Sequence, residues 1–142
     1  MSGLVISGGR VVDPASGMDA VADIAVLDGK VVAVGTGLGG ADRVIDATGL
    51  VVAPGFIDLH AHGQSVPADR MQAFDGVTTS LDLEAGVLPV ASWYRRQAET
   101  GRVLNYGASV NWAFARIGAM TGSNEESSLE AFGRAMRRSP LG

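Results

Sequence analysis

The chain has 142 residues, of which 46% are hydrophobic and 18% charged, a size and composition typical of one modest globular domain rather than a disordered segment. Its net charge of −4 offers no basic surplus for nucleic acid, and without cysteine it can form no disulfide, thiolate metal site or cysteine nucleophile. It shows no secretory signal pattern and no apolar run of membrane-spanning length, so we expect a cytoplasmic protein with neither nucleic-acid nor membrane partners.

Residues 1–53 predict a small β domain. Short β-branched runs, among them "LVIS", "DIAVLD" and "KVVAVG", alternate with turn signals throughout this segment. Asp28-Gly29 separates two of these runs and is typical of a hairpin, because both turn positions favour a positive φ. We therefore expect a small antiparallel sheet or half-sandwich.

Residues 54–142 predict an alternation of strands and helices instead. Alternation of this kind indicates parallel strands joined by right-handed crossovers. A first strand ends at His62 and is followed by a short helix or turn at residues 67–76. The later expected elements are strands over residues 77–83 and 102–110, and helices over about 89–100 and 123–138.

Both histidines of the chain lie in the stretch "VVAPGFIDLHAHGQ". Its first part, residues 51–59, is mostly apolar and predicts a buried strand. Side chains alternate along a strand, so Asp58, His60 and His62 point to one face. Two imidazoles spaced in this way can reach one divalent ion.

The spacing alone leaves another interpretation open, in which His60 and His62 are hydrogen-bonded polar residues at a strand end. Their position favours the metal, because they stand where the first parallel strand gives way to a loop. The catalytic residues of α/β barrels gather at such strand ends.

The stretch "VIDATGLVVAPGFIDLHAHGQ" strongly resembles the entry to the metal-dependent amidohydrolase superfamily, and "ADIAVLDGKVVAVG" is similar to its sandwich hairpin. The resemblance covers roughly residues 1–110, and "FDGVTTSLDLEAG" makes it nearest to the D-aminoacylase-like branch, the N-acyl-D-amino-acid deacylases. It implies a β-sandwich-type domain over residues 1–53, followed over residues 54–142 by the first strand–helix units of a (β/α)8 TIM-like barrel, which is incomplete here. In that family the first barrel strand ends in His-x-His and binds metal, so the resemblance makes His60 and His62 ligands of one or two divalent ions, expected to be zinc.

Glu84 is a third candidate ligand. It closes "TTSLDLEAG" at the predicted end of the second barrel strand, and it shares a face with Ser80 and Asp82. The D-aminoacylase-like enzymes have a metal-binding cysteine near this point, whereas this chain has Ala85 there. A carboxylate can replace a thiolate, so Glu84 is a candidate bridging ligand. Alternatively, Glu84 caps the following turn or pairs with an arginine such as Arg95, and we interpret Asp82 as a satisfied polar residue.

Four further residues are candidates for a place beside the metal. Asp58 is expected to orient an imidazole, because ligating histidines usually donate their second N–H to a carboxylate or carbonyl. Asn105, Tyr106 and Asn111 are expected to line a substrate pocket, unless they are merely solvated polar residues.

The barrel of a complete amidohydrolase needs about 250 residues. The resembling family goes on to use a lysine or similar bridge, histidines of later strands, and an aspartate as general base. This sequence has no third histidine, and Lys30, its one lysine, lies in the sandwich hairpin. We therefore expect the N-terminal fragment of an enzyme that hydrolyses C–N (amide) bonds by metal-activated water, with N-acyl-D-amino acids among its candidate substrates. The fragment alone is expected to be inactive.

Two other interpretations remain open. The chain could be a non-catalytic piece that works only with a partner, since open sheet edges invite self-association. It could also be a stand-alone metal-binding module, for which Glu84 or Asp82 would have to supply a further ligand. A small-molecule amide is the partner expected of the enzyme.

Overall fold

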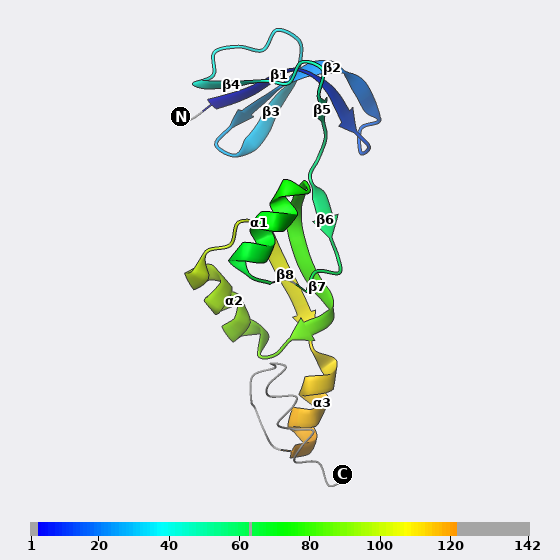
Figure 1. Cartoon of the computed structure of the whole chain (residues 1–142), viewed down its shortest axis with the longest axis vertical. Coiled ribbons are helices and arrows are strands. Elements are labelled where there is room, and N and C mark those ends of the chain that lie inside the picture. The colour runs from blue at the N-terminus through cyan, green and yellow to red at the C-terminus, as the bar shows by residue number, and fades with distance from the viewer. Residues whose placement is uncertain (1–2, 63, 122–142) are drawn as a thin grey trace. The chain divides into compact units, whose positions relative to one another are not determined.

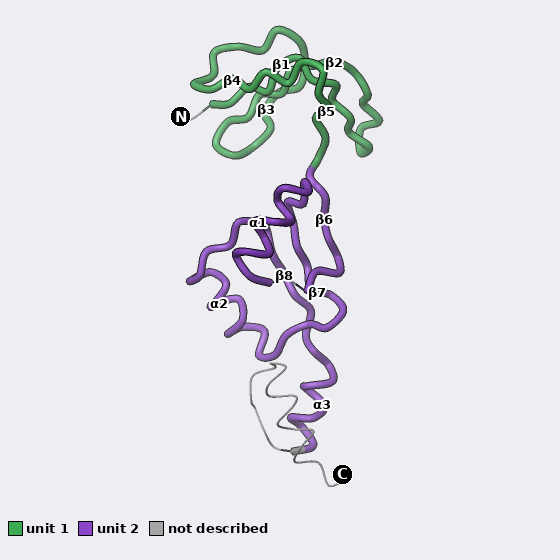
Figure 2. Tube along the Cα trace, viewed as in Figure 1, with its two compact units in different colours: residues 1–54 green, residues 55–142 purple. Residues whose placement is uncertain are grey.

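The computed structural model describes residues 3–62 and 64–121, and it shows a mixed α/β protein. The chain divides into two compact units, Met1–Pro54 and Gly55–Gly142 (Figures 1 and 2). Each unit contains a sheet of its own. In the described part of the chain, no helix has both the length and the apolar character needed to cross a membrane.

The first unit holds a mixed sheet rather than the purely antiparallel one that the sequence predicts. Strand β1 is antiparallel to β2, which is antiparallel to β3, but β1 is parallel to both β4 and β5. A hairpin signal specifies only antiparallel neighbours, whereas the connection at residues 36–42 returns the chain to the edge of β1 in the same direction. The strands are β1 (Gly3–Asp13), β2 (Met18–Leu27), β3 (Lys30–Gly35), β4 (Arg43–Asp46) and β5 (Val51–Val52).

A buried carboxylate closes an irregularity in β1. The register with β2 shifts between Ile6 and Gly9, which leaves backbone groups there without strand partners. The Asp23 carboxylate accepts hydrogen bonds from Gly8 N at 2.8 Å, Ser7 Oγ at 2.9 Å and Leu38 N at 3.1 Å. These bonds, above all the one from Gly8 N, lower the pKa of Asp23 below its ordinary value.

The second unit holds a parallel sheet of order β6-β7-β8, with α1 between β6 and β7 and α2 between β7 and β8. Consecutive crossovers of this kind are nearly always right-handed, which puts both helices on one face of the sheet (Figure 1). The elements are β6 (Phe56–Asp58), α1 (Val66–Phe74), β7 (Val77–Val87), α2 (Val90–Thr100), β8 (Asn105–Val110) and α3 (Trp112–Thr121).

The first predicted strand of this unit is shorter and less buried than expected. The sequence predicts a buried run over residues 51–59 in a strand that ends at His62, but Val51–Val52 pairs with β1 and the next strand covers only Phe56–Asp58. Pro54 interrupts the run, since it has no N–H for a strand ladder. Phe56 and Ile57 are exposed because β6 pairs only with β7 in the part of the chain that the structure describes.

Helix α3 follows β8 directly, in a stretch between the elements that the sequence predicts. Asn111 Oδ1 accepts a hydrogen bond from Phe114 N at 2.8 Å, which caps the first turn. The following segment, "WAFARIGAM", contains no proline and several good helix formers. The helix predicted over residues 123–138 lies outside the described residues.

Candidate metal centre

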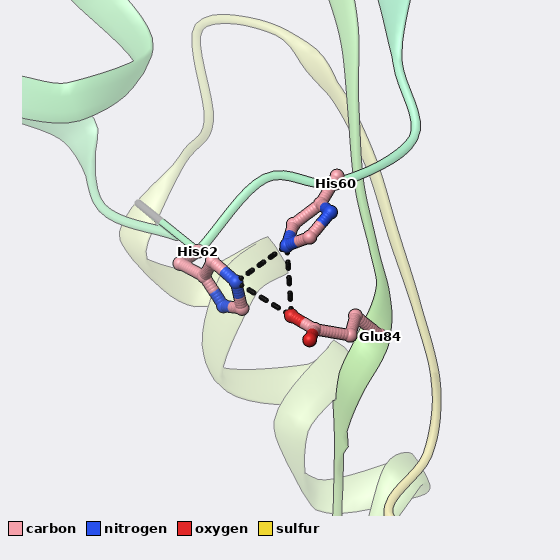
Figure 3. Close-up of side chains that lie close together, drawn as sticks. All are labelled: His60, His62 and Glu84. Atoms are coloured by element: carbon pink, nitrogen blue, oxygen red, sulfur yellow. Dashed lines mark hydrogen bonds and ion pairs between the residues drawn. The ribbon is translucent and has the colours of Figure 1, made fainter.

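Three side chains converge at the ends of two neighbouring strands. His60 and His62 follow β6, and Glu84 belongs to β7. The two histidine Nε2 atoms are 3.0 Å apart, and each lies 2.8 Å from Glu84 Oε2 (Figure 3). The structure thus brings together the three predicted ligands, and Glu84 faces the histidines rather than Arg95.

The arrangement of these atoms fits a divalent metal ion. Zinc bonds to imidazole nitrogen and carboxylate oxygen are about 2.0 to 2.2 Å long. Three atoms separated by 2.8 to 3.0 Å can all lie at that distance from one point outside their plane. Three electron-pair donors so close together repel one another unless a proton or a cation lies between them. Imidazole with carboxylate is a donor set that suits zinc and similar ions.

The site is open to solvent. The side chains of His60, His62 and Glu84 are 65%, 57% and 61% exposed. A metal held by three protein ligands keeps at least one position for water or substrate, which is the arrangement of catalytic rather than structural zinc sites. The exposed side leaves room for that position.

A bulge in β7 positions Glu84. The pairing of β7 with β8 passes from Asp82↔Ala108 directly to Val87↔Val110, so residues 83–86 lie opposite a single residue, Ser109. Asp82 Oδ1 accepts hydrogen bonds from Ala85 N at 3.1 Å and Gly86 N at 3.0 Å. Glu84 therefore projects from a loop within the strand, held by the carboxylate that precedes it.

The backbone conformation of the bulge requires a glycine at position 86. Its φ is 68°, in the region that side-chain-bearing residues rarely adopt, and an added Cβ would lie 2.7 Å from Ser109 O. The roles of Asp82 and Gly86 in this bulge are not among those predicted from the sequence. The signal was a glycine inside a strand pattern, which is typical of a bulge.

The backbone between the two histidines is fixed from several sides. Ala61 is buried, and its N–H donates to Leu81 O at 3.0 Å. His60 pairs with Asp82 in an isolated bridge. Gln64 Nε2 donates to Ala61 O at 3.0 Å, so both backbone polar groups of Ala61 are satisfied.

Gln64 is in turn held by a buried ion pair. Arg102 Nη1 donates to Gln64 Oε1 at 3.0 Å and to Gln97 Oε1 at 2.8 Å. The remaining donors of the Arg102 guanidinium bind both carboxylate oxygens of Asp69 in α1. A continuous hydrogen-bond chain therefore runs from α1 to the loop that carries His60 and His62.

The other predicted site residues have structural contacts. Asp58 does not orient an imidazole in this structure: its Oδ1 accepts from His60 N at 3.0 Å and its Oδ2 from Gln72 Nε2 at 3.2 Å. It positions the backbone of His60 instead. Asn111 caps α3, as described above.

Asn105 and Tyr106 are the first residues of β8, at the opposite end of that strand from the candidate ligands. Asn105 pairs with Thr79, three residues before the level of Asp82 and so about 10 Å back along the strand. Its Nδ2 donates to Thr78 O at 3.1 Å. The ring of Tyr106 packs against Trp93 and Tyr94 of α2, and Arg102 lies over it.

Comparison with known proteins agrees with this geometry. The sequence profile described as "Amidohydrolase family" matches residues 43–139, which is more than half of the chain. The chain belongs to the amidohydrolase family. Membership in the metal-dependent amidohydrolase superfamily, predicted from the motif around His60 and His62, is thereby confirmed.

Curated amidohydrolases match the chain over short stretches. A dihydroorotase of Solibacter usitatus is 52% identical over 60 residues, which are 42% of this chain and 14% of the relative. A dihydroorotase of Streptococcus thermophilus is 43% identical over 90 residues, 63% of this chain and 19% of the relative. The chain thus matches about a fifth or less of the length of these relatives.

Solved amidohydrolase structures match more of the chain. The N-acyl-D-glutamate deacylase of Bordetella bronchiseptica, complexed with zinc and a phosphonate inhibitor, has a TM-score of 0.68 at 27% identity, covering 76% of this chain and 29% of that one. The L-hydantoinase of Arthrobacter aurescens has a TM-score of 0.62 at 27% identity, covering 75% of this chain and 27% of that one. Both a deacylase of an N-acyl-D-amino acid and a hydantoinase are therefore among the similar structures.

Proposed function

We propose that this chain is the N-terminal part of a metal-dependent amidohydrolase that hydrolyses C–N (amide) bonds of a small molecule. The observation that carries the proposal is the convergence of His60 Nε2, His62 Nε2 and Glu84 Oε2 within 3.0 Å of one another. Family membership supports the reaction class, and the donor set supports the metal.

In this proposal, the second unit is the beginning of a TIM-like barrel and the first unit is part of a β-sandwich domain. The order β6-α1-β7-α2-β8-α3 with parallel pairing supports the barrel. So does the position of the candidate ligands, since catalytic residues of such barrels lie at the C-terminal ends of the strands. His60 and His62 follow β6, and Glu84 lies near the end of β7.

His60 and His62 would hold the ion through their imidazoles, and Glu84 would hold it through its carboxylate. When bound, a divalent ion such as zinc acts as a Lewis acid and lowers the pKa of a bound water toward about 7. Asp58 keeps the backbone of His60 in place by its hydrogen bond to His60 N. A general base is needed to move a proton from water to the leaving nitrogen, and we assign it to an aspartate outside these 142 residues.

The substrate class is an amide whose carbonyl can approach the open side of the site. The similar structures divide between the deacylation of an N-acyl-D-amino acid and the opening of a cyclic amide in hydantoinases. Both reactions break a carbonyl–nitrogen bond, and the proposal is limited to that shared chemistry.

Zinc binding by the 142-residue chain tests the metal site directly. We expect one equivalent of zinc in competition with a chromogenic chelator, and loss of that binding in His60→Ala and in His62→Ala. Glu84→Gln should weaken binding, whereas Glu99→Gln, which removes the same charge from an exposed position on α2, should not. Zinc binding that survives both histidine substitutions would contradict the proposal.

A second candidate function is a metal-binding module without catalysis. The observation in its favour is the exposure of all three ligand side chains, each above half. This candidate predicts zinc binding but no hydrolysis when the chain is supplied together with the remaining segments of a full-length relative. Hydrolysis by that reconstituted protein, lost in His60→Ala, would eliminate it.

A further inference from the structure

Asp82 lies beside two of the candidate ligands, His60 and Glu84, without being a ligand itself. Its backbone pairs with His60 in an isolated bridge, so it lies beside the loop that carries the histidines. Its side chain contacts the segment that carries Glu84: Oδ1 accepts hydrogen bonds from Ala85 N and Gly86 N. Asp82 is only 7% exposed, so water does not compete effectively for these bonds.

The bulge depends on these two bonds. Residues 83–86 have left the ladder between β7 and β8, so their amides lack the strand partners that regular pairing would supply. Asp82 Oδ1 supplies an acceptor to two of them, and Ser109 Oγ donates to Leu83 O at 3.3 Å. Without the Asp82 acceptor the segment would have to rearrange to satisfy its amides, and Glu84 lies in the middle of it.

We propose that Asp82 is a positioning residue of the metal centre, which fixes the bulge at residues 83–86 so that Glu84 Oε2 meets the two imidazoles. The inference rests on the proposed metal-binding function and adds a residue to it. Asp82 acts through Glu84 and the backbone, and it contributes no atom to the ion.

Substitutions at Asp82 separate its hydrogen-bond acceptor from its charge. Asn keeps an oxygen that can accept both bonds, whereas Ala does not. Residues that support metal ligands typically contribute about 10- to 100-fold to metal affinity, so we expect Asp82→Ala to weaken zinc binding by roughly tenfold or more. Asp82→Asn should remain close to the wild-type affinity.

The experiment measures zinc affinity by chelator competition, and the visible spectrum of the cobalt(II) form, in the 142-residue chain. The cobalt spectrum reports the ligands and geometry around the ion. Asp82→Ala should change it toward the spectrum of Glu84→Gln, while Asp82→Asn should keep the wild-type bands. A loss of folded protein alone would reduce the amplitude without changing the bands.

Asp23→Ala is the matched control, because Asp23 is another buried carboxylate that closes a strand irregularity, but in the first unit. It should leave zinc affinity unchanged. If Asp82→Ala does not fold, Asp82→Glu keeps the charge and displaces the acceptor, and it should weaken zinc binding.

Two outcomes separate the inference from the proposed function. Wild-type affinity and spectrum in Asp82→Ala, or wild-type affinity in Asp82→Glu, would overturn the inference while leaving histidine-dependent binding intact. Absence of zinc binding by the wild-type chain would overturn the proposed function together with the inference.

Discussion

Asp69 and Arg102 form a buried ion pair that spans 33 residues of the chain, with side chains 0% and 1% exposed. Asp69 belongs to α1, and Arg102 lies between α2 and β8. The guanidinium also binds Gln64 and Gln97 and lies 5.1 Å from the ring centre of Tyr106. The pair therefore joins α1 and α2 to the loop beside the candidate metal centre.

Arg102→Ala is expected to destabilise the second unit by about 3 to 5 kcal/mol, because it leaves the Asp69 carboxylate buried without its partner. Urea unfolding followed by the fluorescence of Trp93, which is buried on α2, measures this loss. A Trp112→Phe background removes the exposed second tryptophan from the signal.

Arg10→Ala is the control for this prediction. It breaks the pair between Arg10 and Asp19, which has a short distance of 2.6 Å but lies at the surface. Solvent screens such pairs, so no measurable loss of stability is expected. Because the first unit has no tryptophan, its urea unfolding is followed by circular dichroism. Equal destabilisation by both substitutions would show that burial does not set the contribution of the Asp69–Arg102 pair.

The sequence predicts the grouping of the candidate ligands for a clear physical reason. Side chains alternate along a strand, and the C-terminal ends of neighbouring parallel strands meet at one edge. The second rule accounts for the meeting of the histidines with Glu84. The first does not fix their directions, because β6 ends at Asp58, before both histidines, and Glu84 lies in a bulge. The motif around the histidines also identifies the family, which the sequence profile confirms.

The features that the sequence does not predict depend on contacts between distant segments. The parallel direction of β4 follows from the path of a connection, which local propensity does not report. The bulge that carries Glu84 depends on Asp82 accepting from two amides across it. The sequence predicts that the third strand of this unit starts at residue 102, but β8 starts at Asn105. The side chain of Arg102 binds Asp69 instead, a contact that the strand-like run does not reveal.

Acidification is expected to destabilise the first unit through Asp23. Hydrogen bonds from Gly8 N, Ser7 Oγ and Leu38 N lower the pKa of Asp23 in the folded state below the ordinary value of 3.8. A carboxyl group with a lowered pKa stabilises the fold above its unfolded pKa, and this contribution is lost as the pH falls through its folded pKa. Amide hydrogen exchange at Gly8 and Leu38 should accelerate as the pH is lowered below about 4, beyond the intrinsic pH dependence of exchange.

Asp23→Asn tests the same carboxylate at neutral pH. In the variant, the amide nitrogen of Asn takes the place of the oxygen that accepts from Leu38 N, so two donors face each other. The variant should therefore be less stable than the wild type at pH 7. The variant should also show a smaller further loss on acidification, since it has no carboxylate to protonate at this position. An unchanged acid response would assign the pH dependence to other carboxylates, such as Asp46, whose pKa is also lowered.

Gly86→Ala is expected to destabilise the second unit by more than about 1 kcal/mol and to weaken zinc binding. The residue has φ 68°, and the new Cβ would lie 2.7 Å from Ser109 O, so the bulge must shift. Urea unfolding and chelator competition measure the two effects. Gly101→Ala is the matched control, because Gly101 has φ 74° in the same unit but no atom within 4 Å of an added Cβ.

Zinc should stabilise the second unit by linkage. A ligand that binds only the folded state at 100 times its Kd stabilises that state by about 2.7 kcal/mol. The urea midpoint of Trp93 fluorescence should therefore rise with zinc and return to its original value when a chelator removes the metal. His60→Ala should show no such rise. A rise of equal size in His60→Ala would place the zinc elsewhere.

The 142-residue chain alone is not expected to hydrolyse amides. Three ligands hold one ion at most, and hydrolysis also needs a base to take the proton from the attacking water. His60, His62 and Glu84 are more than half exposed, so bulk water weakens the electrostatic stabilisation that an enclosed site would give to the transition state. The test is the purified chain with zinc, assayed on N-acyl-D-amino acids and cyclic amides. Turnover above background that disappears in His60→Ala would contradict this prediction and would show that residues of this chain, or a second copy of it, complete the site.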